Sequence, residues 1–162
     1  MGKIVIFGAG GRAGRAAVAE ARQRGHQVTA VVREPGKHRG LAGDGVRLVA
    51  GDATETESVA GVAEGHDAAI SAVYDAGAYP DAFFTGLARA LLDGLPRAGV
   101  ERLLAVGLAS VLKNASGVAL MNTPGYPQEY RSFYLAHAAG ADVLRAETDR
   151  LDWLIVERPR RI

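Results

Sequence analysis

The sequence predicts an α/β protein built on one doubly wound parallel sheet, and three patterns indicate this fold. Short apolar runs rich in Val and Ile alternate with helical segments along the 162 residues. These runs are continuous, as in strands that helices cover on both faces. A glycine cluster at residues 8–14 follows the first run and opens the first helical segment. We therefore expect a single domain over residues 1–162, with the strand order 3-2-1-4-5-6.

Local sequence patterns predict where each strand and helix begins and ends. The apolar runs predict six strands: Lys3–Phe7, Gln27–Val32, Val46–Ala50, Ala68–Val73, Arg102–Val106 and Trp153–Val156. Helix-forming residues predict four helices: Ala13–Arg24, Thr54–Glu64, Pro80–Arg97 and Phe133–Arg150. Thr54, with Glu57 three residues on, is suited to cap the second helix. The third carries a large apolar residue at every fourth position, namely Phe83, Leu87, Leu91 and Leu95. This spacing predicts a helix face that packs against the core.

Composition and charge narrow the classes of partner. Lys and Arg number 19 and Asp and Glu 18, which disfavours nucleic acid because phosphate binding needs a basic field. The chain has no cysteine and its four histidines are scattered, so we expect no metal site. No apolar run has the length of a membrane span, and the N-terminus lacks a signal-peptide pattern. We expect a cytoplasmic protein without a membrane partner, either a monomer or a homodimer.

The glycine cluster has the chemistry of a dinucleotide-binding loop. A pyrophosphate binds at a helix N-terminus, where free N–H groups face the anion and no side chain intervenes. Gly8, Gly10 and Ala13 fit the spacing G-x-G-x-x-A, while Gly8, Gly11 and Gly14 fit G-x-x-G-x-x-G. Either spacing predicts that the loop, including Arg12, binds a nicotinamide dinucleotide. The alternative is a glycine-rich turn without a ligand.

The end of the second strand predicts the choice of cofactor. An acidic residue there binds the ribose hydroxyls of NAD, whereas this chain has Arg33. Arg33 and Arg12 of the glycine loop together suit the 2′-phosphate of NADP. Two observations keep NAD as the alternative: both arginines could be solvated surface residues, and Glu34 stands beside Arg33.

Several segments match one family of proteins. They are residues 3–14, 31–35, 51–52, 67–72, 99–103, 122–124 and 151–153. In combination they resemble the atypical short-chain dehydrogenase/reductases, in the branch that includes flavin reductase/biliverdin reductase B-like and NmrA-like proteins. The resemblance implies a Rossmann-type fold that binds NAD(P)H.

The resemblance also implies roles for individual residues. Arg33 would contact the adenosine end of the cofactor, and Asp52 would lie near the adenine. Ser71 and Ala72 would pass beside the nicotinamide-side ribose, and Ser110 would face the reaction centre. The family usually continues well past Arg158-Pro159, so the resemblance implies a shortened C-terminal part and an open acceptor site.

One departure from the wider superfamily bears on the reaction. The Tyr-x-x-x-Lys pair is missing, because Tyr126, Tyr130 and Tyr134 are followed four residues on by Tyr, Tyr and Ala. Reduction of a flavin or a similar planar acceptor needs less acid from the protein, so we expect a small-molecule acceptor of this kind. A non-catalytic NAD(P)-sensing protein, as among the NmrA-like relatives, is the alternative.

Three residues are candidates for the reaction centre, each with a structural alternative. Ser110 could orient the acceptor or only satisfy backbone groups at a strand end. His137, near a histidine found in some family members, could be catalytic or structural. Tyr130 could stack on a planar ligand or pack beneath the loop.

Overall fold

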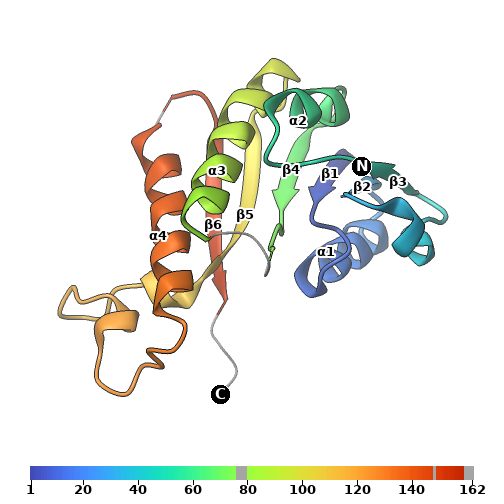
Figure 1. Ribbon diagram of the computed structural model, residues 1–162. Helices are drawn as coiled ribbons and strands as arrows, with labels where there is room; N and C mark the ends of the chain where they lie inside the picture. The colour runs from blue at the N-terminus through green and yellow to red at the C-terminus, as the bar shows by residue number, and fades with distance from the viewer. Residues whose placement is uncertain (76–79, 148, 159–162) are drawn as a thin grey trace.

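A computed structural model describes residues 1–75, 80–147 and 149–158 of the chain. Its centre is a six-stranded sheet in the order β3-β2-β1-β4-β5-β6, in which every neighbouring pair of strands is parallel. Helices lie on both faces of this sheet (Figure 1). The predicted Rossmann-type fold and strand order are therefore confirmed.

The elements follow one another in regular alternation. The strands are β1 (Lys3–Phe7), β2 (Gln27–Val32), β3 (Val46–Ala50), β4 (Ala68–Ser71), β5 (Arg102–Leu108) and β6 (Asp152–Arg158). The helices are α1 (Arg12–Gln23), α2 (Thr56–Ala63), α3 (Pro80–Arg97) and α4 (Arg131–Ala146). Short 3-10 turns occur at Pro35–Lys37, Arg39–Leu41, Ala109–Val111 and Leu120–Asn122. No helix in these described ranges is both long and apolar enough to cross a membrane.

Two apolar cores lie on opposite faces of the sheet. One contains α2, α3 and α4 and includes the expected face of α3, with Leu87, Leu91 and Leu95 buried and Phe83 partly buried. The other lies between α1 and β1–β3, where Val18 of the helix meets Ile6 and Ala30 of the strands. Successive residues of a strand point to opposite faces, so Val5 and Ile6 enter different cores. This burial on both faces explains the continuous apolar runs.

The structure corrects the expected bounds of two helices. Thr54 does not cap α2, because its N–H and Oγ1 donate to Asp52 Oδ1 at 2.9 and 2.6 Å in the turn before the helix. The helix begins two residues later, at Thr56. In α4 the helix ends at Ala146, and Arg150 lies beyond it, where its guanidinium pairs with Asp93 of α3 at 2.7 Å.

Candidate functional site

A cleft of about 1220 Å³ lies along the edge of the sheet where the strands end. Its walls come from the segments that follow β1 to β5 and from α4. Ligands of open α/β sheets bind outside the carboxyl ends of the strands, and the cleft occupies that position. It is therefore the candidate functional site.

The glycine loop between β1 and α1 forms one wall of the cleft. Its conformation requires glycine, because a β-carbon at several of its positions would clash with neighbouring atoms. Gly8 has a φ of +72°, and a β-carbon there would lie 2.5 Å from the carbonyl oxygen of Ala72. A β-carbon at Gly14 would overlap the carbonyl oxygen of Gly8, so α1 can pack closely against the end of β1. Gly10 is in contact with the ring of His38, whose Cε1 would lie 2.5 Å from a β-carbon.

The first turn of α1 is suited to bind an anion. Gly11 is the N-cap residue and provides no side-chain cap, which leaves the N–H groups of the first turn available to a ligand. Gly11, Arg12 and Ala13 all line the cleft. The helix dipole and the Arg12 guanidinium add positive charge at the same place. These features fit the pyrophosphate of a dinucleotide.

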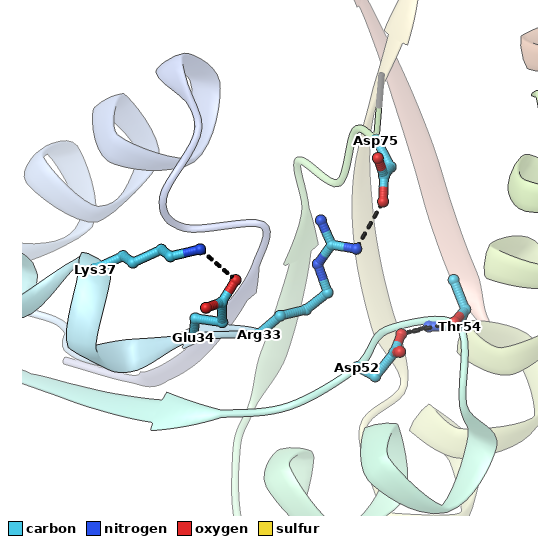
Figure 2. Close-up of polar contacts among 6 residues, drawn as sticks. All are labelled: Arg33, Glu34, Lys37, Asp52, Thr54 and Asp75. Carbon is cyan, nitrogen blue, oxygen red and sulfur yellow. Dashed lines mark hydrogen bonds and ion pairs between the residues drawn. The ribbon is translucent and has the colours of Figure 1, made fainter. Parts of the chain in front are cut away.

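At the far side of this loop, the end of β2 presents charged residues that are paired within the protein. Arg33 Nη1 lies 2.6 Å from Asp75 Oδ2, and Lys37 Nζ lies 2.7 Å from Glu34 Oε1 (Figure 2). The hydrogen bond from Lys37 and its positive charge lower the pKa of Glu34. Glu34 is thus engaged by Lys37, and Arg33 turns to a carboxylate from the segment after β4.

Asp52 and Ala72 line the cleft as expected, whereas Ser71 does not. The Asp52 carboxylate accepts from Thr54 (Figure 2). The Asp52 N–H donates to Ser58 Oγ at 2.8 Å, so this turn has a defined shape. Ser71 is buried and lines a separate small cavity of about 60 Å³ between the sheet and α3 and α4. The alternation of side chains along β4 points Ser71 to the face covered by these helices.

Two buried hydroxyl groups line the other half of the cleft. Ser110 and Tyr134 are only 1% and 5% exposed, and neither hydroxyl has a hydrogen-bond partner in the described part of the chain. Buried hydroxyl groups are normally hydrogen-bonded, so each of these two can take a further partner such as water or a ligand. Tyr130, the expected tyrosine, also lines the cleft but is 45% exposed.

His137 lies between the cleft and the small cavity and contributes to both. Its ring is 3.8 Å from the ring of Phe84, centroid to centroid, and meets Phe133 edge-on at 4.7 Å. Burial lowers the pKa of His137 to about 4. The ring is therefore neutral at pH 7 and brings no positive charge to the cleft.

Comparison with known proteins agrees with this geometry. A family model described as NAD(P)H-binding matches residues 8–161. The chain belongs to this NAD(P)H-binding family. The uncharacterized protein YwnB of Bacillus subtilis is 33% identical over 153 residues, which cover 93% of this chain and 68% of YwnB.

Solved structures of similar proteins share the fold of this NAD(P)H-binding chain. A candidate epimerase from Bacteroides thetaiotaomicron has a TM-score of 0.83 at 32% identity. The match covers 95% of this chain and 69% of the epimerase chain. A candidate NADH-flavin reductase from Streptococcus pneumoniae has a TM-score of 0.78 at 29% identity. The match covers 97% of this chain and 71% of the reductase chain.

Two residues that line the cleft, Tyr134 and Asp75, were not among the candidates from the sequence analysis. Tyr134 lies in α4 on one face with Ala141 and Leu144, and these three residues are buried. Tyr130 is the residue before the helix and is exposed. Asp75 has no such local signal, because only the fold brings it to Arg33, 42 residues earlier.

Proposed function

We propose that this protein is an NAD(P)H-dependent oxidoreductase that passes a hydride from NADPH to a flavin or a similar planar acceptor. The observation that carries the proposal is a pair of buried hydroxyls, Ser110 and Tyr134, that have no hydrogen-bond partner among the described residues. They lie at the opposite end of the cleft from Arg33 and Asp52. The family supports a nicotinamide cofactor. The fold shared with a candidate NADH-flavin reductase supports a flavin acceptor.

The residues of the cleft divide into two groups along its length. The glycine loop, Arg12, Arg33 and Asp52 would hold the pyrophosphate and adenosine, which leaves the nicotinamide near the ends of β4 and β5. Beyond that point the wall is aromatic and includes Tyr126, Tyr130, Phe133 and Tyr134. A planar ring can stack on or pack against such a wall.

When bound, NADPH supplies the hydride, and a proton from water completes the reduction of the acceptor. Ser110 and Tyr134 would donate hydrogen bonds to acceptor nitrogen or oxygen atoms on which negative charge develops. Because both hydroxyls are already desolvated and unpaired, no existing bond within the described residues must break when the acceptor binds. The aromatic side chains and His137 would exclude water from the reacting faces.

Removing either hydroxyl should slow turnover. We expect Ser110→Ala and Tyr134→Phe each to lower kcat with NADPH and FMN about tenfold, because a donor to the developing charge is lost. The dissociation constant of NADPH should stay within about twofold of wild type, since neither change touches the adenosine or pyrophosphate sites. Steady-state kinetics and fluorescence titration of NADPH give the two quantities.

The matched control is Ser116→Ala, in which the same hydroxyl is removed from an exposed loop residue outside the cleft. It should leave both quantities unchanged. Wild-type protein that binds NADPH but does not oxidise it faster with FMN, FAD or quinones would instead favour the non-catalytic sensing function. The missing Tyr-x-x-x-Lys pair is compatible with that alternative.

The choice of NADPH over NADH should depend on Arg33. We expect Arg33→Ala to weaken NADPH binding at least about fivefold, because a charge-assisted hydrogen bond to the 2′-phosphate is lost. NADH lacks this phosphate and should bind nearly as before. Titration of both cofactors measures the effect, with Arg24→Ala, which removes an arginine paired with Glu20 away from the cleft, as the control. An equal loss for both cofactors would contradict the assignment.

A further inference from the structure

The ion pair between Arg33 and Asp75 crosses the cleft. Arg33 follows β2 and Asp75 follows β4, and in the sheet these strands lie on either side of β1. The pair therefore spans the end of β1, from which the glycine loop begins. Both residues line the same cleft as that loop, so the protein places a carboxylate of its own against the arginine at the adenosine end.

The contact is close and the two partners are unequally buried. Arg33 Nη1 and Asp75 Oδ2 are 2.6 Å apart, and the Asp75 side chain is 21% exposed against 66% for Arg33. Glu34, the acidic neighbour of Arg33 in sequence, is bonded to Lys37 instead. Figure 2 shows the two carboxylates turned to different cations. Asp75 therefore occupies a position on the Arg33 guanidinium that a ligand phosphate would otherwise take.

We infer that Asp75 is a specificity-determining residue, which competes with the adenosine 2′-phosphate for Arg33 and thereby reduces the preference for NADPH over NADH. This inference rests on the proposed function, in which Arg33 reads the 2′-phosphate. NADH carries no phosphate at that position, so its binding does not compete with Asp75 for Arg33. The 2′-phosphate of NADPH must share Arg33 with Asp75 or displace Asp75 from it. In either case the negative charge of Asp75 stays close to a phosphate that itself carries up to two negative charges.

The size of this effect follows from electrostatics. A unit charge about 6 Å from a dianion in a water-like dielectric changes affinity about tenfold before screening. Arg33 is largely exposed, and physiological salt screens such a pair, so we expect about a fivefold effect. Repulsion between Asp75 and the pyrophosphate is common to both cofactors and cancels when their affinities are compared as a ratio.

Asp75→Asn tests the inference, because asparagine keeps the shape of the side chain and removes its charge. The probes are adenosine 2′,5′-bisphosphate, which carries the 2′-phosphate, and adenosine 5′-monophosphate, which lacks it. Calorimetric titration should show the bisphosphate binding about fivefold tighter to the variant than to wild type, with the monophosphate within about twofold. The gain should shrink as salt is raised.

Two further variants make the result specific. Asp93→Asn removes a carboxylate from another arginine pair, Asp93–Arg150 at 2.7 Å, outside the cleft, and should change neither affinity. In Arg33→Ala/Asp75→Asn, the group for which Asp75 competes is gone and only the repulsion between Asp75 and the phosphate has been removed. Relative to Arg33→Ala, the double variant should therefore gain less bisphosphate affinity than Asp75→Asn gains relative to wild type. Circular dichroism and the monophosphate affinity establish that each variant is folded; Asp75→Ser replaces Asp75→Asn if the latter is not.

The outcomes separate the inference from the proposed function. An unchanged ratio of the two affinities in Asp75→Asn overturns the inference, and so does an equal gain for both probes, which would make the pair a barrier to any adenosine nucleotide. Failure to oxidise NADPH with any acceptor, together with the expected change in ratio, would overturn the proposed reaction and leave the inference standing. Failure of wild type and every variant to bind either probe would overturn both.

Discussion

Gly14→Ala should lower the free energy of unfolding by about 3 kcal/mol or more, because the new β-carbon meets only backbone atoms. It would overlap the Gly8 carbonyl oxygen and lie 2.7 Å from Ala9 Cα, and neither atom can move without shifting the glycine loop. Alanine in place of glycine in a helix contributes about 1 kcal/mol of stability. The clash exceeds this gain, so the net effect is destabilising. Urea denaturation measures it.

Gly61→Ala is the matched control, since Gly61 lies within α2 and a β-carbon there would have no atom within 4 Å. This substitution should raise stability by about 0.5–1 kcal/mol through helix propensity alone. Opposite signs for the two substitutions would show that close packing, and not a general property of helical glycine, requires Gly14. Equal stability of Gly14→Ala and wild type would contradict the packing of α1 against the end of β1.

His137 should make the protein less stable at acidic pH. Its pKa is lowered by burial from the model-peptide value of 6.5 to about 4 in the folded state. Between these values the unfolded chain binds a proton that the folded protein does not, so stability is full above about pH 6.5 and falls as the pH falls towards 4. The loss between pH 7 and pH 5 is about 2 kcal/mol.

Comparison with His137→Phe isolates this contribution, because phenylalanine retains a ring against Phe84 and Phe133 but does not titrate. The stability of the variant relative to wild type should rise by about 2 kcal/mol from pH 7 to pH 5 and stay constant between pH 7 and pH 8. Burial raises the pKa of Glu157, which lines the same small cavity, and this carboxyl titrates in both proteins. A pH-independent difference would show that the His137 ring is accessible to protons in the folded protein.

Much of the fold could be predicted from the sequence because its signals are local. The first three strands have the expected bounds, since each apolar run ends at a glycine or charged residue. Of the three, β1 and β2 are buried on both faces, and β3 at the edge of the sheet is partly exposed. The glycine spacing placed the turn and the start of α1, because Gly8 needs a positive φ and Gly14 needs close packing at fixed positions of one loop. The strand order followed from right-handed connections and from the position of the glycine loop.

Side-chain direction and pairing at the strand ends were decided by the tertiary structure. Ser71 and Ala72 are neighbours in sequence, yet the pleat of β4 turns Ser71 into the cavity and leaves Ala72 at the cleft. Tyr134 lies inside α4 and is buried against the ring of Tyr126, whereas Tyr130 precedes the helix and is exposed. Arg33 met Asp75 only because β2 and β4 lie on either side of β1. The sequence alone therefore determined where a dinucleotide loop forms, while the surroundings of each charged or hydroxyl group depended on contacts between residues far apart in the chain.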